Sequence, residues 1–226
     1  MSDLPLTLAC WDYDRTRPLI DGRVKAKGID LDVKMLRPRV MFPRMLEDKE
    51  FHASELSLAS YASLLGRGDT TFRALPVAVS KIFRHSCIYV SAKSGIKTAK
   101  DLIGKKIGVP EYQMTAPVWI RGILSDHYGV PVDSVTYWTG GEEEPGRPEK
   151  QKLNLPPNIK VNSIPEDRTL AQMLRDGEID AFYTARKPSS FDGKQVTRLF
   201  ENFVEVEKAY YQQTGMFPIM HTVAIK

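Results

Sequence analysis

Cysteine is scarce in this sequence, and long apolar runs are absent. Cys10 and Cys87 are the only two cysteines in 226 residues, and both lie in apolar segments. They cannot supply a disulfide framework or a cysteine zinc site, so we expect buried, small side chains. No stretch approaches the roughly 18 consecutive apolar residues of a membrane span. The first residues lack the basic and apolar regions of a signal peptide, and we expect a cytoplasmic protein.

Glycine, proline and charge show no excess that would point to a special class of protein. The 15 glycines and 15 prolines are near average usage, which excludes collagen-like and low-complexity chains. Hydrophobic residues make up 42% and charged residues 27%, as in ordinary globular proteins. The net charge is only +4, and prolines interrupt the basic cluster of Arg37, Arg39 and Arg44. We therefore expect no nucleic-acid partner.

Strand-like and helical segments alternate along the chain. Apolar alternation or β-branched runs predict strands at 4–11, 28–33, 51–58, 72–79, 86–90, 106–109, 135–138, 159–164, 179–183 and 220–226. Helical spacing and stop signals predict helices at 15–25, 40–48, 60–65, 98–102, 114–128 and 169–176. This order indicates an α/β protein with mostly parallel sheets and flanking helices. Because the sequence ends on a strand, we expect one sheet face to need a further segment or a second chain.

Two segments resemble the second lobe of type II periplasmic binding proteins. These are "SGIKTAKDLIGKKIGVP" from Ser94 and "TLAQMLRDGEIDAFYT" from Thr169. The resemblance implies a two-lobed fold in which residues 1–91 begin the first lobe, 92–190 form the second, and 191–226 return to the first. It also implies a ligand held in the cleft between the lobes by loops after strands and by helix N-termini.

A narrower resemblance extends over residues 6–222. The blocks "EYQMTAPVWIRGIL" and "GGEEEPGR", with "LTLACWDYDRTRPLIDGRV", "FHASELSLASY" and "IDAFYTARKPSSF", are similar to the 4,5-dihydroxyphthalate decarboxylase family. This implies cofactor-independent conversion of 4,5-dihydroxyphthalate, or a similar hydroxylated aromatic acid, to 3,4-dihydroxybenzoate and CO2. The alternative is a solute-binding protein for a small aromatic or heterocyclic anion. The family has a helical tail after the point that matches Lys226, so we expect an incomplete first lobe here, with apolar surface that could drive homo-oligomer formation.

Such a decarboxylation needs a base near a phenol, an acid near the reacting carbon and cations for a carboxylate. The catalytic candidates are His85, Asp12 and His221. Histidine titrates near neutrality, and Asp12 follows the first predicted strand, where it could equally cap a helix.

The candidates for substrate binding are aromatic, polar or cationic residues near predicted strand ends and helix starts. Trp11 could stack on an aromatic ring, and Arg15 and Arg186 could hold carboxylates. Alternation places Glu55 and Ser57 on one face of a strand, which could equally be a wet edge. Gln113 and Thr115 open a predicted helix and could contact an anion. The run of acids at Glu142–Glu144 is expected to be solvated and to bind no metal.

Overall fold

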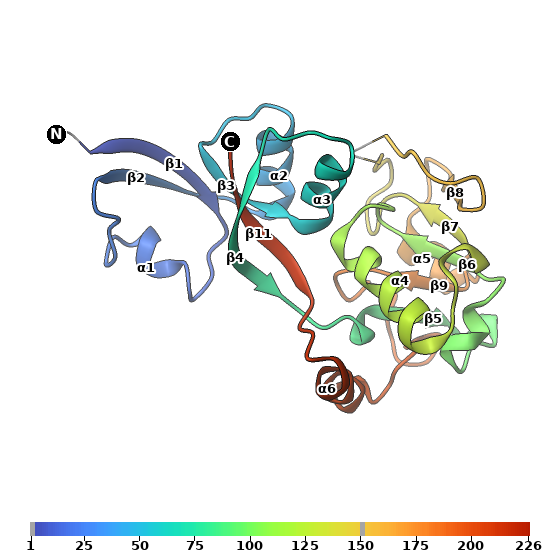
Figure 1. The fold of residues 1–226 in the computed structure, drawn as a ribbon. Helices are drawn as coiled ribbons and strands as arrows, with labels where there is room; N and C mark the ends of the chain where they lie inside the picture. Colours follow the sequence, from blue (N-terminus) through green and yellow to red (C-terminus); the bar gives the residue numbers. More distant parts are fainter. Residues whose placement is uncertain (1–2, 150–151) are drawn as a thin grey trace. The chain divides into compact units, whose positions relative to one another are not determined.

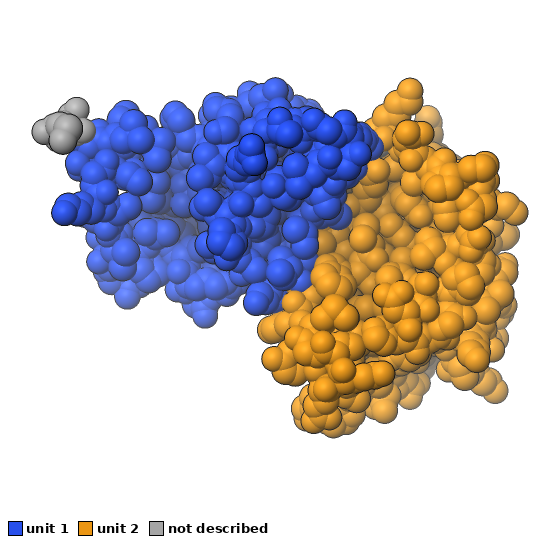
Figure 2. Space-filling model, in the orientation of Figure 1, with its two compact units in different colours: residues 1–82, 219–226 blue, residues 83–218 orange. Residues whose placement is uncertain are grey.

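The computed structural model describes residues 3–149 and 152–226. The chain divides into two compact units, one of residues 1–82 and 219–226 and the other of residues 83–218 (Figure 2). Each unit is built around its own β-sheet and carries its own apolar core. None of the helices in the described part of the chain is long and apolar enough to cross a membrane.

The first unit holds a five-stranded sheet in the order β2-β1-β3-β11-β4 (Figure 1). Its strands are β1 (Leu4–Cys10), β2 (Ile29–Met35), β3 (Ala53–Ser57), β4 (Arg73–Lys81) and β11 (Ile219–Ile225). Its helices are α1 (Arg17–Ile20), α2 (Pro38–Leu46) and α3 (Leu58–Gly66). Strands β1, β2 and β3 are parallel, whereas β11 inserts antiparallel between β3 and β4. The carboxyl ends of β1, β2 and β3 therefore share one edge of the sheet with the start of β11.

The core of the first unit comes largely from α2. Met41, Phe42 and Met45 lie on one side of this helix and pack with Leu56 of β3 and Ala224 of β11. Their spacing is that of an amphipathic helix, so burial of this stripe fixes α2 against the sheet.

The second unit holds a six-stranded sheet in the order β10-β5-β9-β6-β7-β8. Its strands are β5 (Ile88–Ser91), β6 (Lys106–Val109), β7 (Thr136–Thr139), β8 (Lys160–Ser163), β9 (Ala181–Tyr183) and β10 (Val196–Arg198). Its α-helices are α4 (Thr115–Tyr128), α5 (Leu170–Asp176) and α6 (Phe203–Thr214). Short 3₁₀ turns occur at η1 (His85–Cys87), η2 (Ala92–Ser94), η3 (Ala99–Leu102) and η4 (Val132–Ser134). Strands β6, β7, β8 and β9 are parallel, and β5 and β10 join by antiparallel pairing.

Helix α4 shows how the sequence determines these elements. Ala116, Ile120 and Leu124 recur every four residues and are all buried. Gly129 ends the helix with φ +66°, a left-handed conformation that glycine adopts without steric cost. The predicted helix over 114–128 is confirmed for this reason.

Both sheets are mostly parallel, as expected, and the exceptions are β11 in the first unit and β5 in the second, each antiparallel to both of its neighbours. Two other expectations differ from the structure. The helix expected over 15–25 is only the four-residue α1, since Gly22 at φ +76° turns the chain away after Asp21. The predicted lobe boundaries at 91 and 191 also differ, because the pairing of β5 with β9 and β10 places residues 83–91 and 191–218 in the second unit.

Candidate functional site

Glu55 is the centre of a polar cluster in the first unit. It lies on β3 and is fully buried, with 0% of its surface exposed. Its Oε1 accepts hydrogen bonds from Tyr13 Oη and His221 Nδ1, both at 2.6 Å. Its Oε2 accepts the Trp11 backbone N–H at 2.9 Å. The cluster thus joins the loop after β1 to β3 and to β11, at the carboxyl edge of the sheet.

The contacts of Glu55 determine its charge. Burial by itself would raise the pKa of this carboxyl, but the hydrogen bonds and charge from His221, with those from Tyr13 and Trp11, outweigh burial and lower the pKa. An ionised carboxylate accepts hydrogen bonds only, so the Nδ1 of His221 carries the proton. Burial, followed by the hydrogen bond to Glu55, raises the pKa of the Tyr13 phenol far above its ordinary value. Tyr13 is therefore a neutral hydrogen-bond donor.

The imidazole of His221 is held in one orientation. Its Nδ1 is bound to Glu55, its second ring nitrogen is Nε2, and 21% of the side chain is exposed. Phe42 of α2 meets the imidazole edge-on with ring centroids 5.0 Å apart, which fixes the plane of the ring. A carboxylate behind a histidine stabilises the imidazolium and orients the ring.

The other predicted residues of the first unit have varied surroundings. Asp12 pairs through Oδ2 with Arg17, while its buried Oδ1 has no partner among the described residues. Arg15 donates through Nε to the Val79 carbonyl at 2.8 Å and through Nη1 to Asp14 at 2.8 Å. Arg15 also covers the Tyr13 ring at 4.3 Å. The Arg15 side chain is half exposed, but these contacts occupy the donors of its guanidinium and leave it little capacity to bind a further carboxylate.

Ser57 lies on the same face of β3 as Glu55, as alternation predicts, and pairs across the sheet with His221. Its hydroxyl accepts the Ser60 N–H at 3.3 Å and so caps α3. Its described contact is thus the cap of a helix, which is a structural role.

In the second unit, the residues predicted to bind substrate lie after the carboxyl ends of β6 and β9. These strands are parallel neighbours, so Gln113 and Thr115 after β6 share an edge with Arg186 after β9. The Oε1 of Gln113 is buried and has no hydrogen-bond partner among the described residues. Arg186 is exposed, and Thr115 is buried at the start of α4.

The acidic run Glu142–Glu144 is not simply solvated, contrary to the expectation. Glu142 accepts the Thr184 hydroxyl at 2.8 Å, and burial raises the pKa of its carboxyl. Glu143 accepts the Ser189 N–H at 2.8 Å and also the Ser189 hydroxyl. No cluster of three or more histidine, cysteine or acidic side chains in the described part of the chain could hold a metal ion.

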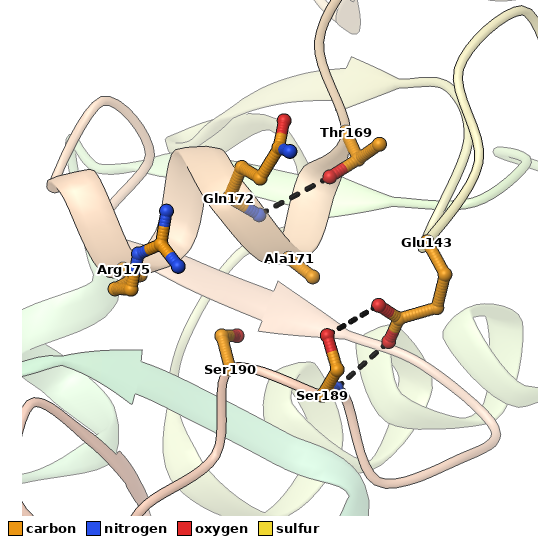
Figure 3. Close-up of a pocket in the computed structure, with 7 residues that line it drawn as sticks. All are labelled: Glu143, Thr169, Ala171, Gln172, Arg175, Ser189 and Ser190. Carbon is orange, nitrogen blue, oxygen red and sulfur yellow. Dashed lines mark hydrogen bonds between the residues drawn. The ribbon is translucent and has the colours of Figure 1, made fainter.

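A cavity of about 200 Å³ adjoins Glu143 in the second unit (Figure 3). It is lined by Glu143, Thr169, Ala171, Gln172, Arg175, Ser189 and Ser190. In Figure 3 the Glu143–Ser189 pair lies on one side and Arg175 on the other, so the cavity combines an acceptor with a cation. None of these seven residues was among the sequence-predicted candidates.

His85 lies in the second unit in apolar surroundings. Only 1% of its surface is exposed, and neither ring nitrogen has a hydrogen-bond partner among the described residues. The rings of Tyr128, Phe200 and Tyr210 surround it edge-on at 5.7, 5.3 and 5.2 Å. Burial, with a smaller effect of His127, lowers the pKa of His85 from 6.5 to about 4. The structure therefore presents His85 as a neutral packing residue.

Comparison with known proteins gives the family. The whole chain aligns over 228 residues with 4,5-dihydroxyphthalate decarboxylase of Comamonas testosteroni, at 42% identity and over 69% of that protein. The corresponding protein of Pseudomonas putida is 43% identical over 191 residues, covering 84% of this chain and 74% of that one. The chain belongs to the 4,5-dihydroxyphthalate decarboxylase family. No family model matches the sequence.

The solved structures place this decarboxylase family member in a known fold. The periplasmic aliphatic sulphonate binding protein SsuA of Escherichia coli matches 99% of the chain with a TM-score of 0.50 and 11% identity. At that identity the match shows the fold alone, which is that of the periplasmic binding proteins. The chain spans 65% of the length of SsuA.

Sequence reasoning found Glu55 and His221 separately but missed their partner Tyr13. The phenol lies two residues beyond Trp11 in a loop, where no periodic pattern indicates its direction. It could be found only through the hydrogen bond to a residue 42 positions away. The approach of Arg37 to Trp11 was missed for the same reason.

Proposed function

We propose that this chain decarboxylates 4,5-dihydroxyphthalate, or a similar hydroxylated aromatic carboxylate, to 3,4-dihydroxybenzoate and CO2. Two curated relatives at 42% and 43% identity bear that enzyme's name. The observation that carries the chemistry is the buried Glu55 carboxylate bound to His221 Nδ1 at 2.6 Å. It prepares the Nε2 of His221 to deliver a proton. With this function, we also propose that the protein acts in the cytoplasm.

The reaction consumes one proton and breaks one carbon–carbon bond. The hydroxyl para to the leaving carboxylate loses its proton to a base and pushes electron density into the ring. His221 Nε2–H protonates the ring carbon that bears the leaving carboxylate. The bond to that carboxylate then breaks, CO2 leaves, and the electron pair restores the aromatic ring. The phenolate recovers its proton, and solvent returns a proton to the partly exposed His221.

Each residue of the cluster has a distinct part in this proposal. Glu55 stabilises the imidazolium before transfer and holds the ring plane afterwards. Asp12 is the base for the phenol, because its Oδ1 has no partner among the described residues. Tyr13 is held neutral by Glu55 and serves as a donor to it. His85, buried among aromatic rings, takes no part in proton transfer in this scheme.

The test is proton NMR of 4,5-dihydroxyphthalate incubated with the chain in H₂O and in D₂O. The substrate has one aromatic signal and the product has three, and in D₂O the vacated carbon gains deuterium. We expect His221→Gln and Glu55→Gln to lower kcat/KM by about 10²-fold or more, as is usual for loss of general acid catalysis. His52→Gln is the matched control, because His52, which directly precedes β3, is exposed and its ring accepts the Thr7 N–H of β1.

The possible results distinguish an absent decarboxylase activity from a wrong assignment of the catalytic residues. No conversion by the wild type would overturn the decarboxylase proposal. Substrate signals that broaden without conversion would then favour a solute-binding protein. Conversion that is unchanged in His221→Gln would remove His221 from the reaction while leaving the activity in place.

A further inference from the structure

Arg15, Arg17 and Arg37 lie close to the loops that follow β1 and β2, and the first two already bind other groups. Arg17 forms an ion pair with Asp12. Arg15 binds Asp14 and the Val79 carbonyl. Arg37, which directly precedes α2, differs from both. Its guanidinium lies 6.0 Å from the centre of the Trp11 ring, and no acidic or carbonyl partner of that guanidinium occurs among the described residues.

The position of Arg37 is set by the same elements that form the Glu55 cluster. Strands β1 and β2 pair from end to end, with Cys10 opposite Met35. The Leu36 N–H then donates to the Cys10 carbonyl at 3.2 Å, which joins the two strand ends. Trp11 and Arg37 are the next residues on either side of this bond, so their side chains start from one place on the sheet edge.

Two further contacts connect this pair to His221. The Trp11 backbone binds Glu55, whose other oxygen binds His221 Nδ1. Phe42, one turn into α2 from Arg37, packs against the imidazole. Trp11 and α2 therefore each connect Arg37 with His221 through contacts within the first unit.

We propose that Arg37 is the residue that recognises the carboxylate retained in the product, while Trp11 stacks on the aromatic ring. A guanidinium forms two parallel hydrogen bonds with a carboxylate, and it also lies favourably over an aromatic ring. This inference rests on the proposed function, since it names the substrate determinant of that site. It transfers to Arg37 the role that sequence reasoning gave to Arg15.

The test compares two ligands that differ only in the carboxylate. Calorimetric titration measures the affinities of 3,4-dihydroxybenzoate and of catechol, which has the same diol and no carboxylate. We expect Arg37→Met to weaken binding of 3,4-dihydroxybenzoate at least tenfold and binding of catechol less than twofold. Arg37→Lys should recover part of the loss, because the charge returns without the planar fork.

The matched control is Arg73→Met, which removes the same charge from the opposite end of the sheet. Arg73 begins β4 and pairs with Ile225, whereas the proposed site lies at the His221 end of β11. The control should keep the wild-type affinity for both ligands, and circular dichroism should show all variants folded.

The proposal is overturned if the wild type binds catechol as tightly as 3,4-dihydroxybenzoate, or if Arg37→Met keeps the wild-type preference. An equal loss for both ligands also overturns it, because Arg37 would then only support Trp11. Turnover of 4,5-dihydroxyphthalate by the wild type is measured on the same preparation. The difference in affinity between the two ligands does not depend on turnover. Failure of the Arg37 proposal can therefore be distinguished from failure of the decarboxylase proposal.

Discussion

The aromatic surroundings of His85 predict an acid-sensitive second unit. Tyr128, Phe200 and Tyr210 enclose the imidazole and offer neither ring nitrogen a hydrogen bond. The nearby charged groups include His127, whose charge opposes a second positive charge, the buried Arg84, which does the same, and Glu207, which accepts the neighbouring Ser86 N–H at 2.9 Å. Protonation of His85 would therefore bury a charge without an acceptor.

The size of this effect on the free energy of unfolding follows from the pKa values of His85 in the unfolded and folded chain. The pKa of His85 falls from 6.5 to about 4 on folding, so between these values the unfolded chain binds a proton that the folded chain does not. This contribution to stability is complete above pH 6.5 and is lost as the pH falls toward 4. At about 1.4 kcal/mol for each pH unit, the free energy of unfolding should drop by about 2 kcal/mol from this group by pH 5.

The perturbation is His85→Phe, and the assay is urea unfolding read by hydrogen exchange of peptides from η1 and α6. Between pH 7.5 and pH 5, we expect the free energy of unfolding to fall by about 2 kcal/mol less in this variant than in the wild type. The comparison across pH cancels any change in packing that the phenylalanine causes at both values. His127→Gln, which alters an exposed histidine, should keep most of the wild-type loss. If wild type and His85→Phe lose equal stability, the argument from burial is refuted.

Two other features make direct predictions. Gly141→Ala should destabilise the second unit by more than about 2 kcal/mol in thermal unfolding, because an added Cβ would lie 1.6 Å from the Glu144 carbonyl oxygen. Gly122→Ala is its control, since a Cβ there meets nothing within 4 Å; it should stabilise α4 by about 0.5–1 kcal/mol, and equal losses in the two variants would contradict the reasoning. Cys10 and Cys87 should resist a thiol reagent at pH 8 and both react after denaturation, because both are buried and burial raises the pKa of Cys10 to about 11. Fast labelling of the native protein would show that these thiols are accessible.

Local patterns predicted the elements of this fold well. The helix over 169–176 was expected from its spacing and from Gly177, and α5 ends at that glycine with φ +79°. Strand alternation correctly placed Glu55 and Ser57 on one face of β3. Such features depend on neighbours a few residues away, which a single sequence contains.

The unit boundaries and the contacts of the site depend on pairing between distant segments. Nothing local to residues 88–91 indicates that this strand pairs with β9 and β10 rather than with β4. Arg15 has the residue type of a carboxylate ligand, yet the Val79 carbonyl, 64 positions away, binds its guanidinium. The partner of this side chain was set by tertiary structure, which local sequence does not contain.

The insertion of β11 between β3 and β4 has a consequence for synthesis of the chain. Glu55 and His221 are separated by 166 positions, and the whole second unit is translated between them. A growing chain that ends before residue 219 presents β3 and β4 with unpaired edges, which invite association with other strands. The first unit can finish its sheet only after the ribosome has passed the second. His221 and Glu55 therefore meet late, after a slow closure over a long loop.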